Sequence, residues 1–90
     1  MTDRTVVQRK GLDVHETEDG LVVYQPDLDR VHYLNETAAA VFVFAASSSS
    51  VESLAEELAA LWELDEPPTA EVDRCVTQLL DEGVLRSAPS

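Results

Sequence analysis

The first third of the chain has short apolar–polar alternations that are typical of strands. Residues 12–17 alternate apolar and polar side chains, which is the period of a half-buried strand. A glycine-containing turn over residues 18–20 leads to a second apolar run at 21–24, and this spacing predicts a hairpin. After another turn around a proline, β-branched and aromatic side chains predict a third strand over residues 30–34. Residues 1–10 show no clear period and are expected to form a frayed arm.

The chain then changes from strand to helix at a single residue, Asn35. An asparagine side chain accepts hydrogen bonds from the first turn of a helix, so Asn35 is predicted to be an N-cap. Residues 38–46 are apolar on nearly every face, which indicates a central and largely buried helix. A serine tetrad at 47–50 interrupts this helix, and Ser50 is the expected N-cap of the next one.

Two further helices follow, each with an apolar stripe at helical spacing. Pro67 and Pro68 end the second helix, because neither residue can donate a backbone hydrogen bond. Thr69 is expected to cap the third helix and Gly83 to end it in the left-handed conformation, with a last extended piece at 84–85. The stripe of the second helix is Val51, Leu54, Leu58, Leu61 and Trp62, and that of the third is Val72, Cys75, Val76, Leu79 and Leu80.

The order of these elements predicts the fold class. Three strands in a meander, followed by three helices, indicate an α+β domain with a three-stranded antiparallel sheet packed on a helical triad. A winged helix-turn-helix-like arrangement satisfies this order. We expect one domain over residues 1–90, with residues 1–10 and 87–90 flexible.

The charge of the chain narrows the classes of partner. Eighteen acidic residues against six basic ones give a net charge of −12, which repels nucleic acid and anionic membranes. No apolar run reaches the roughly 20 residues that cross a bilayer. The start of the chain lacks a signal-peptide pattern, and the one cysteine cannot form an internal disulfide. A cytoplasmic protein is expected.

The sequence lacks the motifs of catalysis and of metal binding. His15 and His32 stand alone, without cysteines or carboxylates at metal-ligand spacing. Cys75 falls in an apolar stripe, where an inert thiol is expected. The three glycines are isolated, so no phosphate-binding loop is present. We therefore expect no enzyme activity and no cofactor.

Three classes of binding function remain open. An extended peptide could pair with the exposed third strand and place side chains against the third helix. An acidic winged-helix interaction or regulatory protein is the alternative, but the only basic residue of the third helix is Arg74, which disfavours DNA. Ser53, at the start of a helix, resembles the pantetheine attachment site of an acyl or peptidyl carrier protein, although carriers are all-helical.

Several segments together resemble the PqqD-like family, the RiPP recognition elements of bacterial peptide-modification pathways. Residues 31–38 resemble the family's strand-to-helix "LN-x-T-A" turn. Residues 51–58 resemble its second helix, and residues 72–80 with 82–85 resemble its closing "L-x-x-x-G-L/V-L". The resemblance begins near Arg9 and covers about residues 9–86.

This resemblance implies a peptide-binding function. Members of the family are not enzymes; they bind the leader segment of a ribosomally made precursor peptide. They present it to a modifying enzyme, such as a radical-SAM protein or a cyclase-type enzyme, or to a leader peptidase. The leader extends the sheet by one strand, in a cleft between the third strand and the third helix. Carried onto this chain, the peptide-binding residues are Arg30, Val31, His32, Tyr33, Leu34, Val72, Arg74, Cys75, Val76, Gln78 and Leu79.

Overall fold

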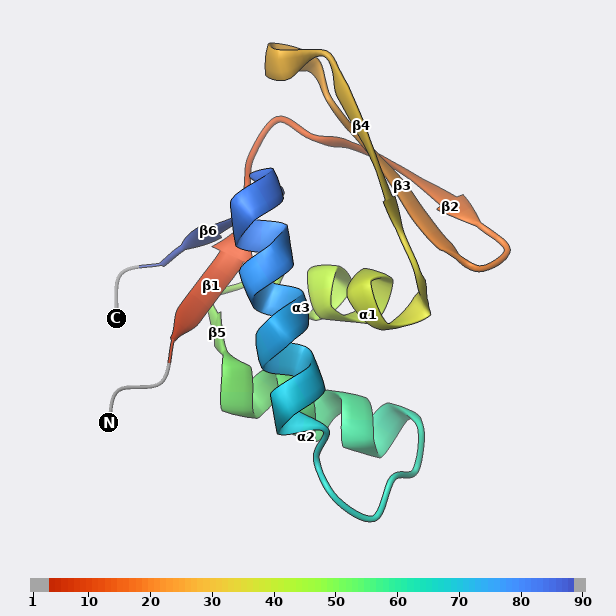
Figure 1. The fold of residues 1–90 in the computed structure, drawn as a ribbon, viewed down its shortest axis with the longest axis vertical. Helices are drawn as coiled ribbons and strands as arrows, with labels where there is room; N and C mark the ends of the chain where they lie inside the picture. Colours follow the sequence, from red (N-terminus) through yellow and green to blue (C-terminus); the bar gives the residue numbers. More distant parts are fainter. Residues whose placement is uncertain (1–3, 89–90) are drawn as a thin grey trace.

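The strands and helices of the protein come from a computed structural model that describes residues 4–88. Their order confirms the predicted α+β class, in which a three-stranded antiparallel sheet is followed by three helices. Figure 1 shows their arrangement in space. The elements are β1 (Thr5–Gln8), β2 (Asp13–Thr17), β3 (Gly20–Gln25), the 3-10 turn η1 (Pro26–Leu28), β4 (Arg30–Leu34), α1 (Glu36–Phe44), β5 (Ser49–Ser50), α2 (Val51–Leu61), α3 (Thr69–Glu82) and β6 (Leu85–Ser87).

The predicted meander forms a sheet with the order β2-β3-β4. Both strand pairs are antiparallel, and the strands β2 and β3 are joined by a two-residue turn. Burial alternates along β3, where Leu21, Val23 and Gln25 face inward. Their β4 partners Leu34 and His32 therefore share the inner face, because paired residues point to the same side of a sheet.

Gly20 allows the sheet to close tightly at the end where β4 leads into α1. A Cβ atom on this residue would lie 1.8 Å from the Leu34 carbonyl oxygen, a distance at which the backbone would have to move. The glycine is therefore required by the close approach of β3 to β4.

The strand-to-helix junction follows the sequence prediction. The Asn35 side chain accepts a hydrogen bond from the Ala38 backbone N–H at 2.9 Å, so Asn35 is the N-cap of α1. Leu34, immediately before it, is buried. The buried leucine and the capped turn together fix the direction in which α1 leaves the strand.

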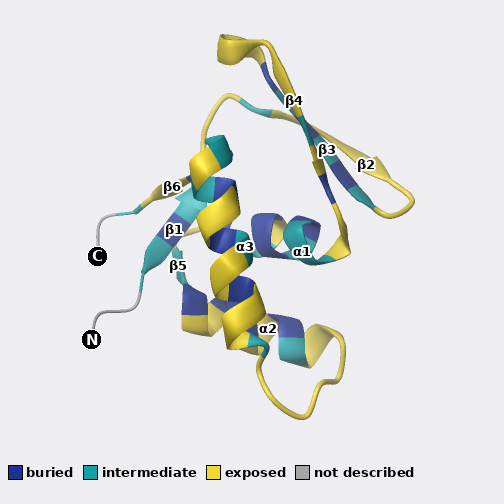
Figure 2. Ribbon diagram, in the orientation of Figure 1, coloured by how far each residue is buried: buried dark blue, intermediate teal, exposed yellow. Residues whose placement is uncertain are grey.

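The three helices enclose the main core, and their buried positions turn toward one another (Figure 2). Phe42, Leu54, Leu58, Val72 and Val76 are among the fully buried side chains. Ser50 caps α2 by accepting from the Ser53 N–H, and Gly83 ends α3 with a φ of 82°, as predicted.

Some local details of the helices differ from the predictions. The central helix α1 is largely buried, as predicted, although the side chain of Val43 on it is exposed. Leu61 and Trp62, which were expected in the apolar stripe of α2, are exposed, and α2 ends at Leu61, before Pro67. The N-cap position of α3 is Pro68, which makes no side-chain cap, and Thr69 is already the first helical residue.

The N-terminal segment forms a strand where a frayed arm was expected. β1 is the middle strand of a second antiparallel sheet with the order β5-β1-β6, on the opposite side of α3 from the first sheet in Figure 1. Val6 is fully buried, and the Gln8 N–H donates to the Ala45 carbonyl at 2.8 Å. The expected flexible tail is likewise ordered at Ser87, which belongs to β6. Residues 1–3 and 89–90 of these two segments lie outside the described residues.

None of the helices within residues 4–88 has both the length and the apolar character that crossing a membrane requires.

Truncation of Val6 tests whether β1 is part of the folded core. Because its side chain is fully buried, we expect Val6→Ala to lower the free energy of unfolding by roughly 1.5–3 kcal/mol in urea denaturation. Val7→Ala is the matched control, since the neighbouring valine is only half-buried and should lose less. Equal losses at the two positions would show that β1 does not pack as described.

Candidate functional site

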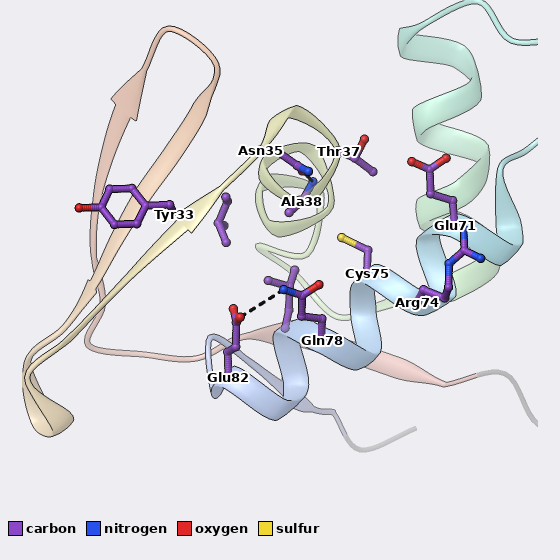
Figure 3. A pocket seen from close by; sticks show the side chains of 11 residues that line it. Tyr33, Asn35, Thr37, Ala38, Glu71, Arg74, Cys75, Gln78 and Glu82 are labelled. Atoms are coloured by element: carbon purple, nitrogen blue, oxygen red, sulfur yellow. Dashed lines mark hydrogen bonds between the residues drawn. The ribbon is translucent and has the colours of Figure 1, made fainter.

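A cleft of about 380 Å³ lies between the end of β4, the start of α1 and one face of α3 (Figure 3). Each wall comes from a different part of the chain, so the cleft exists only in the folded protein. Apolar and polar side chains both reach it. Its lining residues are Tyr33, Leu34, Asn35, Thr37, Ala38, Glu71, Arg74, Cys75, Gln78, Leu79 and Glu82.

The α3 wall of the cleft is a single helical stripe. Glu71, Cys75, Gln78 and Glu82 follow one another at intervals of four, three and four residues, which places them on one face of the helix. The adjacent stripe of Val72, Val76 and Leu79 is buried in the core. Leu79 also reaches the cleft at the boundary between the two stripes.

The β4 wall is the edge of a sheet. Within residues 4–88, β4 pairs only with β3. A two-residue turn joins Thr17 to Gly20, and such a turn is closed by a hydrogen-bonded pair. Hydrogen-bonded and non-hydrogen-bonded pairs alternate along β3 from this turn, and on β4 the pairs of Val31 and Tyr33 are the non-hydrogen-bonded ones. The backbone N–H and C=O groups of Val31 and Tyr33 therefore point away from β3 and toward the open edge.

The side chain of Tyr33 lies on the outer face of the sheet. In Figure 3 its ring points away from α3, and 81% of the residue is exposed. Val31 shares this outer face, since the two residues are two positions apart in a strand. A strand added at this edge would therefore meet apolar side chains on the outer face as well as in the cleft.

A hydrogen-bonded group of side chains links β3 and β4 to the C-terminal end of α3. His32 Nε2 lies 3.1 Å from Gln25 Oε1, and Gln25 Nε2 donates to the Gly83 carbonyl at 3.3 Å. On the other side of the ring, His32 Nδ1 lies 3.7 Å from Glu82 Oε1. Gln25 is the buried polar residue of the core, so this linkage satisfies it and positions β4 relative to α3.

The charges of the cleft are mixed. Arg74 is its single basic side chain, and Glu71 and Glu82 are its two acidic ones. The Gln78 amide donates to Glu82 Oε2 at 3.3 Å, as the dashed line in Figure 3 marks. In the described part of the chain, no three His, Cys, Asp or Glu side chains come together as a metal site would require.

Cys75 lies half-buried in the middle of the α3 wall. Burial raises the pKa of its thiol, and the carboxylates of Glu71 and Glu82 raise that pKa further. The thiolate is the reactive form of cysteine, so this environment makes Cys75 a weak nucleophile.

The structure divides the residues that the sequence suggested for peptide binding. Tyr33, Leu34, Arg74, Cys75, Gln78 and Leu79 line the cleft, while Arg30, Val31 and His32 lie along β4 outside it. Val72 and Val76 are fully buried, so they have no surface that a peptide could contact. The lining residues that sequence reasoning missed are Asn35, Thr37, Ala38, Glu71 and Glu82.

The missed acidic residues could have been found from helical spacing. Glu71 and Glu82 lie on the same stripe as Cys75 and Gln78, but a search for apolar positions does not select them. For Asn35 and Thr37 the sequence indicates only the helix cap and the strand-to-helix turn that they form.

The model of one protein family matches this chain. It is described as "Coenzyme PQQ synthesis protein D (PqqD)", and it matches residues 20–85, well over half of the chain. The chain belongs to the PqqD family. This is the family of RiPP recognition elements, as the sequence resemblance indicated. Searches of curated proteins and of solved structures found no match.

The PqqD match includes both walls of the cleft. It begins at Gly20, where β3 starts, and ends at Leu85, the first residue of β6. β1 and β2 lie outside it. The matched part thus contains β4, α1 and α3, the three elements that line the cleft.

Alkylation of Cys75 by iodoacetamide tests the environment of the cleft. It is the only cysteine of the chain, so the reaction reports on one site. Because its pKa is raised, we expect the midpoint of the rate–pH profile to lie above that of the same chain unfolded in urea. Glu71→Gln should lower this midpoint, since it removes one of the carboxylates that raise the pKa. A folded-state midpoint at or below the unfolded one would contradict the described burial.

Proposed function

We propose that this PqqD-family protein binds the leader segment of a ribosomally synthesised precursor peptide in the cytoplasm. It presents the leader to a modifying enzyme, such as a radical-SAM or cyclase-type enzyme, or to a leader peptidase, and it catalyses no reaction itself. The observation that carries the proposal is the open edge of β4 beside the cleft. Membership of the PqqD family supports an accessory role in peptide maturation.

The bound leader is an extended strand that pairs with the edge of β4. Its backbone bonds to the outward N–H and C=O groups of Val31 and Tyr33. Because side chains alternate along a strand, every second residue enters the cleft and contacts apolar groups such as Cys75 and Leu79. The proposed site consists of Arg30, Val31, His32, Tyr33, Leu34, Arg74, Cys75, Gln78 and Leu79, without the buried Val72 and Val76.

The cleft suits a moderate affinity. Backbone pairing gives affinity that depends little on sequence, and the small apolar surface selects side chains. Ordering a disordered leader opposes binding, so dissociation constants from micromolar to high nanomolar are expected, or about −8 to −10 kcal/mol. Such a complex releases its peptide readily, as presentation to an enzyme requires.

The charge of α3 favours a peptide over DNA. Arg74 stands among Glu71, Asp73, Asp81 and Glu82 on this helix. A recognition helix in a DNA groove lies between two rows of phosphates, which these carboxylates would repel.

Proline substitutions on the two edges of the sheet test strand addition. Val31→Pro and Tyr33→Pro each remove an outward N–H from β4, and each should weaken leader binding roughly 5- to 20-fold. The measurement is isothermal titration calorimetry with the synthetic leader of a candidate precursor peptide. A proline is tolerated on a sheet edge, so the fold should survive, and circular dichroism checks this.

The matched control is Val14→Pro on the opposite edge. Val14 and Val31 are 43% and 48% exposed, and the same alternation directs the Val14 N–H outward from β2. This variant should bind the leader with unchanged affinity. If Val14→Pro weakens binding as much as Val31→Pro, or if neither β4 variant weakens it, the leader does not add to β4.

A further inference from the structure

A second hollow lies on the other side of α1 from the cleft. This groove, of about 310 Å³, is bounded by the tip of the β2–β3 hairpin, the C-terminal half of α1 and the end of α2. Most of its lining is apolar. The lining residues are Glu16, Thr17, Gly20, Leu21, Ala39, Ala40, Val43, Phe44 and Leu61.

The groove and the cleft use different faces of α1. Thr37 and Ala38 line the cleft, whereas Ala40 and Val43 line the groove. Ala38 and Val43 are five residues apart, which is roughly 140° around a helix. The lining residues of the two hollows do not overlap, so both hollows can be occupied at the same time.

The groove belongs to an exposed apolar patch, defined here as Val43, Leu61, Trp62 and Leu64. These four are half of the large hydrophobic side chains that are exposed among residues 4–88. The chain after α2 stays close to the helix, because the Leu64 N–H donates to the Ala59 carbonyl at 2.9 Å. Figure 2 shows the end of α2 and the loop after it as exposed. Val43 and Leu61 meet at the groove, and exposed apolar side chains brought together are typical of an interaction surface.

The charges around the patch are of one sign. Glu16 lines the groove, and Glu63, Asp65 and Glu66 alternate with the apolar residues that follow Leu61. Residues 31–73, which supply α1, α2 and this loop, contain no lysine or arginine. A partner that covers the patch must therefore place positive charges beside its apolar side chains.

The same charges argue against a second copy of the chain. In a two-fold symmetric dimer the same patch would meet itself, and its acidic rim would face an identical rim. The net charge of −12 adds a general repulsion between two copies.

We propose that the groove docks a cationic amphipathic segment of a partner protein, in which apolar side chains are flanked by lysine or arginine. The apolar side chains fill the space between Val43 and Leu61, and the basic ones meet the surrounding carboxylates. Docking here leaves the edge of β4 free. The proposal does not depend on leader binding and can be tested without a leader.

The test uses a synthetic 12-residue lysine–leucine amphipathic peptide as the probe and its glutamate–leucine counterpart as the negative probe. Trp62 is the only tryptophan and directly follows Leu61, so its emission reports on the surroundings of the groove. At physiological salt we expect the basic probe to bind and shift this emission to the blue, and the acidic probe to do neither. Leu61→Asp and Val43→Asp should each weaken binding of the basic probe about tenfold, because each substitution puts a charge into one apolar wall of the groove.

Leu28→Asp is the matched control for these variants. Leu28 and Leu61 are 53% and 54% exposed, and the substitution makes the same change of charge far from the groove, in η1. This variant should bind the probe within about twofold of the unchanged chain. Circular dichroism establishes that all three variants are folded.

Three results would overturn the proposal. If Leu28→Asp and Leu61→Asp both left binding unchanged or strengthened it equally, the basic probe would be held by a general attraction to the acidic surface. Weakening by Cys75→Asp, with no effect of Leu61→Asp, would place the probe in the cleft. A dimer in sedimentation of the free chain that Leu61→Asp dissociates would show that the groove takes a second copy.

Discussion

Helix α1 sets the distance between β4 and α3, and the cleft depends on that distance. The helix continues directly from β4 through the Asn35 cap, and it packs against both the sheet and α3. The strand therefore cannot move toward α3 without moving α1 through the core. At the other end of β4, the contacts of Gln25 with His32 and Gly83 hold the sheet to the end of α3. Fixed at both ends, the edge of β4 stays open beside a wall of side chains.

The elements that sequence could predict are those whose signals are local. The hairpin follows from a two-residue turn, the start of α1 from the Asn35 cap, and the end of α3 from Gly83 in the left-handed conformation. Each of these depends on residues within a few positions of one another. The strand β1 has no such signal, because its partners are 43 and 81 residues away, as in the pairs of Val6 with Ser49 and Ser87. Four residues without a clear alternation do not reveal such a pairing.

The site was predicted in part for a similar reason. The sequence places Val72, Cys75, Val76 and Leu79 on one apolar side of a helix. Because successive residues are about 100° apart around the helix, this side is wide enough to face two different parts of the protein. The part that faces α1 and α2 becomes core, and the part that faces β4 becomes the cleft wall. Only the packed arrangement shows where the division falls, between Cys75 and Val76. Polar residues on the cleft side, such as Glu71, then count as much as the apolar ones.

The acidic surface and the open strand edge contribute to binding in different ways. In the proposed complex, backbone pairing at β4 gives affinity that is nearly independent of the partner's sequence, and by itself it would accept many extended chains. The charge of −12 acts over a longer range, because it repels acidic chains and nucleic acid and raises the rate at which basic partners arrive. The cleft is lined by Arg74 together with Glu71 and Glu82, whereas the residues that line the groove include Glu16 and no lysine or arginine. The two proposals therefore place two partners on opposite sides of α1, one held mainly through its backbone and the other through its apolar side chains and its charge.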